Sequence, residues 1–267
     1  METKTEIYRD RGKRRNMNYK IASIDAHTWM IEEYDETNSV YMYLLEGEER
    51  ALLLDTGFGT IPLKQIVEEL TEKPYIVLNT HAHFDHIGGN YAFEQVYMQE
   101  GDREIYEEHR RMVMEQLPAE KGENNREEML WFSDEPVFEL GNRTLELIHT
   151  PGHSKGCICV LDKEAKRLFT GDTCCKADVL LVFEGSTSVT EYQKTVKKLI
   201  DRRSDFSITW PSHHACPVSP DILDEFQEAA DLLISGKETG HKEMSPFGEW
   251  IKFDYKDIGI AYNKIWD

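Results

Sequence analysis

The stretch Asn79–Gly89 reads NTHAHFDHIGG and places three histidines and one aspartate within six consecutive positions. It overlaps the end of the apolar run YIVLNT, which is typical of a short buried strand. Alternate side chains of an extended segment share one face, so His81 and His83 can point at one cation. Asp85 and His86 follow after the chain turns and can aim at a neighbouring point. Neutral imidazole and carboxylate groups suit zinc, and they also suit iron, manganese and nickel.

Three later segments carry further metal-ligand side chains, each after an apolar run and a turn former. HTPGHSKG contains His153, LFTGDT contains Asp172, and ITWPSHHACP contains His213 and His214. One short segment cannot complete two coordination spheres, so we expect these side chains to supply the remaining ligands. In the last segment, the order of proline, small residue and histidine favours His213 over His214.

These segments resemble, in order, the successive metal motifs of the metallo-β-lactamase superfamily: THAHFDHIGG, TPGHSKG, FTGDT and PSH. The run LLLDTG around Asp55 resembles a further motif that precedes them, and the resemblance covers nearly the whole chain. It implies an α/β fold, an αββα four-layer sandwich of two mixed β-sheets flanked by helices. It also implies a dinuclear metal centre in the cleft between the sheets.

The resemblance also implies a ligand set for two cations and a bridging carboxylate. It assigns His81, His83 and His153 to the first metal, Asp85, His86 and His213 to the second, and Asp172 to the bridge. Asp85 and Asp172 are the expected catalytic residues, because Asp85 would orient the nucleophile and Asp172 would keep the ions together. Asp55 would orient a histidine-bearing loop from behind the ligands. A polar residue that merely ends a strand explains Asp55 equally well.

A centre of this kind indicates a dinuclear metal-dependent hydrolase. Two divalent cations about 3.5–4 Å apart share a water and lower its pKa, so that a metal-bound hydroxide attacks a carbonyl or phosphoryl centre. Zn²⁺ is the expected metal, with Fe or Mn as alternatives. A small ester, lactone or thioester is the expected substrate. The segments GDTCCKADVLL and PSHHACP lack the glycine-arginine loop and the CGHEYT-like segment of glyoxalase II, which argues against that specific enzyme.

Two other function classes remain open at this point. Iron-containing redox or oxygen-handling scaffolds share the fold, but their motif resembles H-x-E-x-D, whereas this chain has His83 at the second position. A non-catalytic metal-binding regulatory protein is the other alternative, and the complete ligand set counts against it.

Composition limits the partners and the compartment. The chain has 267 residues, 40% hydrophobic and 30% charged, which is typical of a globular protein with a substantial core. A net charge of −19 repels phosphate backbones, so we expect a small-molecule substrate and no nucleic acid. No apolar run approaches the roughly 20 residues that span a bilayer, so we expect no membrane partner. The basic N-terminus lacks a signal-like apolar stretch, which favours the cytoplasm; the sequence does not reveal the oligomeric state.

We expect an N-terminal arm at 1–19 and, from the resemblance, a single metallo-hydrolase domain at 20–267. The apolar pattern predicts the elements. It predicts a hairpin at 39–47 and 50–57, helices at 61–70, 187–202 and 221–236, strands at 75–80, 136–140, 144–150, 157–162, 167–172 and 206–210, and closing strands in the tail. A helical insertion is expected near 101–135, either as two amphipathic surface helices or as a lid. The lid would line a substrate pocket with Met112, Met114, Met129, Trp131 and Phe132.

Several chemically suitable residues fall outside the motifs. His27, His109 and His241 match no motif and are expected to be ordinary, and His149 is expected to be structural or to stand behind the ligands. The five cysteines, an odd number with no signal peptide, are expected to be reduced thiols in the core. Cys174, two residues after Asp172, is interpreted as a packed thiol.

Overall fold

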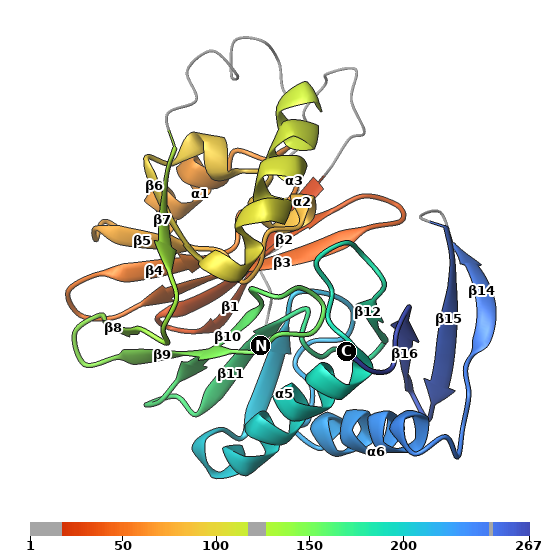
Figure 1. The fold of residues 1–267 in the computed structure, drawn as a ribbon. Helices are drawn as coiled ribbons and strands as arrows, with labels where there is room; N and C mark the ends of the chain where they lie inside the picture. The colour runs from red at the N-terminus through yellow and green to blue at the C-terminus, as the bar shows by residue number, and fades with distance from the viewer. Residues whose placement is uncertain (1–17, 117–126, 246–247) are drawn as a thin grey trace. The chain divides into compact units, whose positions relative to one another are not determined.

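The computed structural model describes residues 18–116, 127–245 and 248–267 (Figure 1). The chain divides into two compact units. The first unit comprises Met1–Phe132 and Phe138–Thr144, and the second comprises Ser133–Val137 and Leu145–Asp267. The predicted arm at 1–19 lies outside the described residues except for Asn18 and Tyr19, which begin a strand. A single domain over residues 20–267 stays a prediction.

The first unit is built on a seven-stranded mixed sheet with the order β1-β2-β3-β4-β5-β6-β7. Its strands are β1 (Asn18–Asp25), β2 (Thr28–Tyr34), β3 (Ser39–Glu46), β4 (Ala51–Leu54), β5 (Tyr75–Leu78), β6 (Gln95–Gln99) and β7 (Glu128–Phe132). The strands from β1 to β4 pair antiparallel, which confirms the predicted β3–β4 hairpin. From β4 to β7 the pairing is parallel, so the carboxyl ends of these strands meet at one edge.

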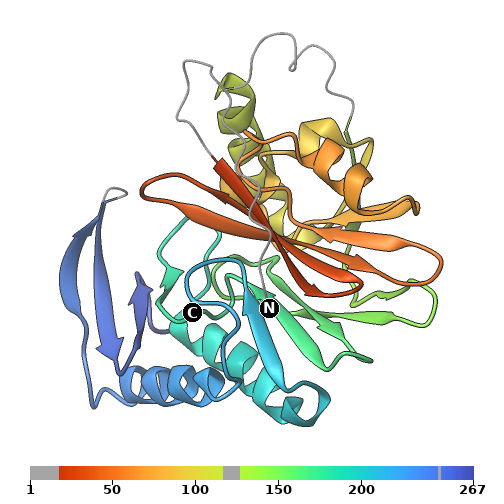
Figure 2. The same ribbon diagram turned by 180° about the vertical axis from the view of Figure 1, so that it is seen from behind.

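The helices of the first unit cover one face of this sheet (Figures 1 and 2). They are α1 (Leu63–Leu70), α2 (Phe84–Ile87) and α3 (Arg103–Gln116), with short 3₁₀ turns η1 (Asn90–Ala92) and η2 (Glu100–Asp102). Helix α1 buries Leu63, Ile66 and Val67 against the strands, because these positions repeat at helical spacing. Pro62 stands at its N-cap, where a missing N–H leaves no bond unmade.

The strands of the second unit, within the residues that the structure describes, belong to two hydrogen-bonded sheets. One has the order β13-β11-β10-β9-β8 and the other β12-β16-β15-β14. The bounds are β8 (Val137–Glu139), β9 (Thr144–His149), β10 (Ile158–Asp162), β11 (Arg167–Gly171), β12 (Asp178–Leu181), β13 (Ile208–Pro211), β14 (His241–Ser245), β15 (Gly248–Tyr255) and β16 (Ile258–Tyr262). Both contain parallel and antiparallel pairs. The division between the units runs through β8.

Two helices, α5 (Val189–Asp201) and α6 (Ile222–Ile234), carry the core of the second unit, and a 3₁₀ turn η3 (Arg203–Asp205) follows α5. The rings of Tyr192 and Phe226 join the two helices edge to face, with centroids 5.9 Å apart. The same core contains side chains from β9, β10, β11, β12, β15 and β16. Mixed sheets flanked by helices confirm the predicted α/β class.

The insertion near 101–135 differs from its prediction. Only α3 is helical, residues 117–126 lie outside the described residues, and Glu128–Phe132 is the strand β7. The predicted second helix is wrong, because Glu128–Phe132 is extended and its alternate residues share one face of the sheet. Met129 and Trp131 pack in a core cluster with Tyr106 of α3. Two of the side chains assigned to a lid therefore belong to the packing of the first unit.

Among the described residues, none of the helices is both long enough and apolar enough to cross a membrane.

Candidate metal centre

The histidine motif of the first unit lies at the carboxyl end of β5, beside the end of β4. Asp55 follows β4 with φ +63°, a left-handed conformation that aspartate tolerates better than most residues. Its buried carboxylate accepts the N–H of Thr80 at 2.7 Å and the hydroxyl of Thr80 at 2.8 Å. It also contacts Nδ1 of His86 at 2.8 Å. Because β4 and β5 are parallel neighbours, Asp55 reaches the loop that carries the motif.

Hydrogen bonds fix which nitrogens of His81 and His86 are available to a cation. The single hydroxyl proton of Thr80 goes to the carboxylate of Asp55, which has no proton to give. Thr80 therefore accepts a bond from Nδ1 of His81 at 3.1 Å. His86 likewise donates its Nδ1–H to Asp55. Both imidazoles are left with a lone pair on Nε2, which is the arrangement that hydrogen-bonded metal-binding histidines adopt.

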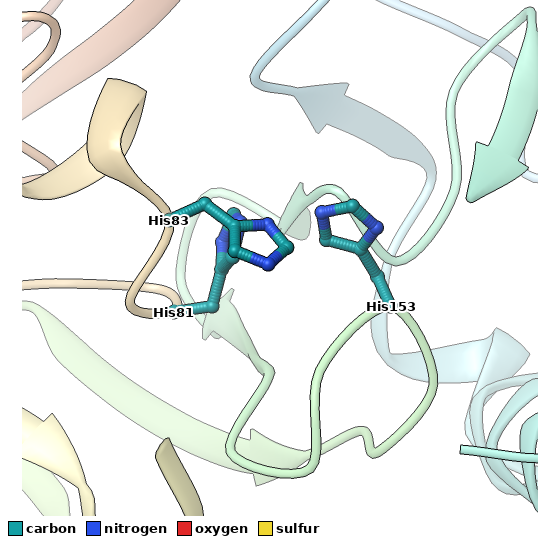
Figure 3. A group of neighbouring side chains, drawn as sticks. All are labelled: His81, His83 and His153. Atoms are coloured by element: carbon teal, nitrogen blue, oxygen red, sulfur yellow. The ribbon is translucent and has the colours of Figure 1, made fainter. Parts of the chain in front are cut away.

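His81 and His83 lie at the distance expected of two ligands on one cation. Nε2 of His81 and Nδ1 of His83 are 3.1 Å apart, and the two rings meet edge to face (Figure 3). Two nitrogens at 2.0–2.1 Å from a tetrahedral Zn²⁺ would be about 3.3 Å apart. Asp85, in the first turn of α2, places Oδ2 4.0 Å from Nε2 of His86. The first unit thus presents a histidine pair and a separate aspartate–histidine pair.

The second unit brings its three predicted ligands together. Nδ1 of His153, whose ring is drawn in Figure 3, bonds the carbonyl of Leu180 at 2.8 Å and must donate to it, so its Nε2 carries the lone pair. That nitrogen lies 3.5 Å from Oδ2 of Asp172, and Nε2 of His213 lies 3.5 Å from the same oxygen. A lone pair facing a carboxylate is stabilised by a cation between them. His214 is exposed and has φ +64°.

Helix α5 shapes the loop that carries His153. The hydroxyl of Thr195 donates to the carbonyl of Pro151 at 2.6 Å, and the N–H of Thr187 donates to the carbonyl of Gly152 at 2.9 Å. A Cβ at Gly152 would stand 2.7 Å from the ring of Tyr192, so only glycine allows this approach without a shift of the loop or the ring.

Other predictions for individual residues are settled by their contacts. His149 bonds the carbonyl of Lys155 at 2.8 Å, a structural role. The five cysteines, all within the described residues, are free thiols, and Cys174 is buried in the core of the second unit as predicted.

The expectation that His109 is ordinary was wrong. Its ring stacks on that of His83 with centroids 5.0 Å apart, and its Nδ1 accepts the N–H of Phe84 at 3.0 Å. Asp102, which the sequence did not single out, accepts the N–H of Ala82 at 2.9 Å. Their spacing of seven residues on a helical segment was the one available signal, since it places both on one helix face. The spacing could not show which loop that face contacts.

The donor set of each unit fits a divalent cation of the zinc type. Imidazole nitrogens with lone pairs fixed by outer hydrogen bonds stand beside carboxylates, and the main ligand candidates His81, His83, His86 and His153 are buried. Whether each residue binds metal stays a prediction.

Comparisons with known proteins agree with this chemistry. Residues 36–209 match the family model of the metallo-beta-lactamase superfamily. The human acyl-coenzyme A thioesterase MBLAC2 is 28% identical over 212 residues, which cover 66% of this chain and 73% of the human protein. Hydroxyacylglutathione hydrolase GloC of Haemophilus influenzae is 29% identical over 158 residues, covering 56% and 69%. The solved structure of a metallo-beta-lactamase from Pontibacter korlensis aligns with a TM-score of 0.62 and 19% identity, covering 79% and 97%.

Proposed function

Because the chain belongs to the metallo-β-lactamase superfamily and has its fold, we propose that it is a dinuclear metal-dependent thioester hydrolase. The observation that carries this proposal is the set of imidazole lone pairs fixed by hydrogen bonds in each unit. In the ligand set that the resemblance implies, His81, His83 and His153 would hold one cation, Asp85, His86 and His213 would hold the other, and Asp172 would be shared by both.

The proposed cations are two Zn²⁺ ions, with iron and manganese as the alternatives that the same donors accept. When bound, such ions lower the pKa of water and polarise the carbonyl of the substrate. The chain's own residues have separate tasks. Asp172 would offset the positive charge of the cations, Asp85 would orient the attacking water, and Asp55 would hold His86 in the tautomer that can bind metal.

Thioesters are favoured within the predicted class of small esters, lactones and thioesters. One relative is named an acyl-coenzyme A thioesterase, and another is named a hydrolase of an acylated glutathione. In the proposed reaction, water adds to the acyl carbon and the carbon–sulfur bond breaks. The products are a carboxylic acid and a thiol, and the second proton of the water passes to the leaving sulfur. A cytoplasmic location and the absence of a nucleic-acid partner stay predictions.

The proposal is tested on purified protein whose metal content has been measured. We expect hydrolysis of acyl-coenzyme A and acyl-glutathione to exceed that of lactone, ester, β-lactam and phosphodiester substrates. Activity should disappear with a chelator and return with Zn²⁺. Asp172→Asn should lose at least about 100-fold in kcat/KM, because it removes the charge proposed to lie between the ions. His241→Asn, at an exposed position of β14, is the matched control.

Two results would contradict the proposal. Metal-free protein that keeps its full activity would exclude the metal-dependent mechanism. Metal-loaded protein that hydrolyses another substrate of the panel in preference to both thioesters would exclude the substrate class.

A further inference from the structure

The turn η2 and the middle of α3 each carry a hydrogen-bond acceptor that faces the histidine motif. Asp102, directly before the helix, accepts the N–H of Ala82, and His109 accepts the N–H of Phe84. Seven residues are about two helical turns, so the two acceptors lie on one face. Ala82 and Phe84 are the residues on either side of His83. The backbone that carries His83 is therefore held on one side by η2 and on the other by α3.

The contact extends to the rings. His109 stacks on His83 at an interplanar angle of 25° and also on Phe84, with centroids 6.1 Å apart. His83 itself is extended, with φ −70° and ψ 150°, and stands at the N-cap of α2. The N–H of Ala82 is buried and that of Phe84 is partly buried, and a peptide donor shielded from water needs an acceptor. The conformation of this loop thus depends on acceptors that η2 and α3 supply.

Helix α3 is in turn fixed to β7. The hydroxyl of Tyr106 donates to Oε1 of Glu127 at 2.9 Å, and Nε of Arg110 donates to the same oxygen at 2.5 Å. The ring of Tyr106 meets that of Trp131 edge to face at 5.5 Å. Burial and then the neighbouring Glu127 raise the pKa of Tyr106, so its hydroxyl stays a donor. A helix held in this way can act as a rigid support for the loop.

We propose that Asp102 and His109 are positioning residues that hold His83 in the geometry of a metal ligand. The segment formed by η2 and α3 then acts as a rigid support for the loop His81–His86. The inference rests on the proposed function, because it takes His83 as a ligand. It also gives the predicted insertion a role different from a lid.

Two substitutions separate the acceptor of His109 from its ring. His109→Phe keeps a stacking ring but removes the acceptor of the Phe84 N–H. His109→Asn keeps an oxygen near the position of Nδ1 and removes the ring. Asp102→Ala and Asp102→Asn form the corresponding pair, because the amide oxygen of asparagine still accepts. Glu108→Gln, exposed on the same helix, is the matched control.

The readout is the affinity of the full-length protein for Zn²⁺, measured by competition with a chromophoric chelator, together with the absorption spectrum of the Co²⁺ form. We expect His109→Phe and Asp102→Ala to weaken Zn²⁺ binding by roughly 10- to 100-fold and to change the Co²⁺ spectrum. The two asparagine variants and Glu108→Gln should stay close to the wild type. Wild-type affinity in His109→Phe and Asp102→Ala would overturn the proposal. Equal losses in His109→Phe and His109→Asn would overturn the role assigned to the acceptor.

A second measurement separates this inference from the proposed function. In chelator-treated protein, hydrogen exchange of the peptide that contains Ala82 and Phe84 should be faster in His109→Phe and Asp102→Ala than in the wild type. Hydrogen exchange that is unchanged in both variants would overturn the proposal that Asp102 and His109 support this loop. Wild-type protein that binds no divalent metal would instead overturn the proposed function, and the exchange result would still report on the loop.

Discussion

A single hydroxyl proton, on Thr80, sets the protonation pattern of the histidine loop in the first unit. Because Thr80 donates to Asp55, it can only accept from His81, and His86 donates to the same carboxylate. Asp55 lies 25 residues before Thr80 and 31 before His86 in the chain. The interpretation in which Asp55 orients a histidine-bearing loop is therefore favoured over that of a polar strand end.

This arrangement predicts the effect of Asp55→Asn. The amide keeps one acceptor oxygen for the N–H of Thr80, but its NH₂ group would donate to Nδ1 of His86. His86 would then carry its proton on Nε2 and lose the lone pair proposed to bind metal. We expect affinity at the Asp85–His86 position to fall roughly 10- to 100-fold. Protein dialysed against buffered Zn²⁺ should then hold about one equivalent of metal, where we expect the wild type to hold two.

Metal content measured by mass spectrometry decides this prediction. Glu72→Gln, an exposed position that follows α1, is the control and should match the wild type. Two tightly held zinc ions in Asp55→Asn would show that the tautomer of His86 does not depend on this carboxylate.

At the scale of an element, α5 contributes a side-chain donor to the loop that carries His153. Thr195 is buried and bonds the carbonyl of Pro151 at 2.6 Å. Thr195→Val preserves the shape of the side chain but leaves that carbonyl without its donor. We expect the free energy of unfolding to fall by about 1 kcal/mol and thioester kcat/KM to fall with it.

Thr195→Ser is the matched control, since serine keeps the hydroxyl and loses only a methyl group. Urea denaturation and steady-state kinetics of the two variants provide the test. If Thr195→Val equals the wild type in both measurements, or if Thr195→Ser loses as much catalytic efficiency, the hydroxyl is not what holds the loop.

Elements also show where sequence reasoning succeeds. The β3–β4 hairpin, α1, α5 and α6 follow from local apolar periodicity and were predicted within a few residues. The strand β7 was mistaken for a helix, because its five residues are too few to separate the two periods beside a charged helical segment. The short strand β12 was not predicted, and its parallel partner β16 is far away in the sequence.

At the scale of the whole molecule, the same distinction separates the candidate ligands from the residues that we propose position them. His81, His83, Asp85 and His86 were recognisable because they stand together in one motif. Asp102 and His109 were not, because their role depends on the packing of α3 against a loop about 20 residues earlier. Local sequence carries the chemistry of a site, whereas the contacts that orient it arise only from the tertiary fold.

The acidic composition of the molecule also makes its stability depend on pH. The chain has 50 acidic and 31 basic side chains, and burial and hydrogen bonds shift the pKa of a few of the described carboxyl groups. Glu46 is an example in which burial acts to raise the pKa, while bonds from Thr71, Lys73 and His27 outweigh it and lower the pKa. Its carboxylate accepts the hydroxyl of Thr71 and lies 3.1 Å from Nζ of Lys73.

The sign of the effect follows from linkage. A carboxyl whose pKa is lower in the folded state contributes stability above its ordinary value near 4.5, and this contribution is lost as pH falls through the folded pKa. Glu46→Gln should therefore lower the free energy of unfolding by about 1.5 kcal/mol at pH 7, the scale of a hydrogen bond to a charged group. The difference from the wild type should shrink as the pH drops below 4.5. Urea unfolding at a series of pH values measures it, with the exposed Glu48→Gln as control. A difference that stays constant across the series would mean that Glu46 contributes by packing and not by its charge.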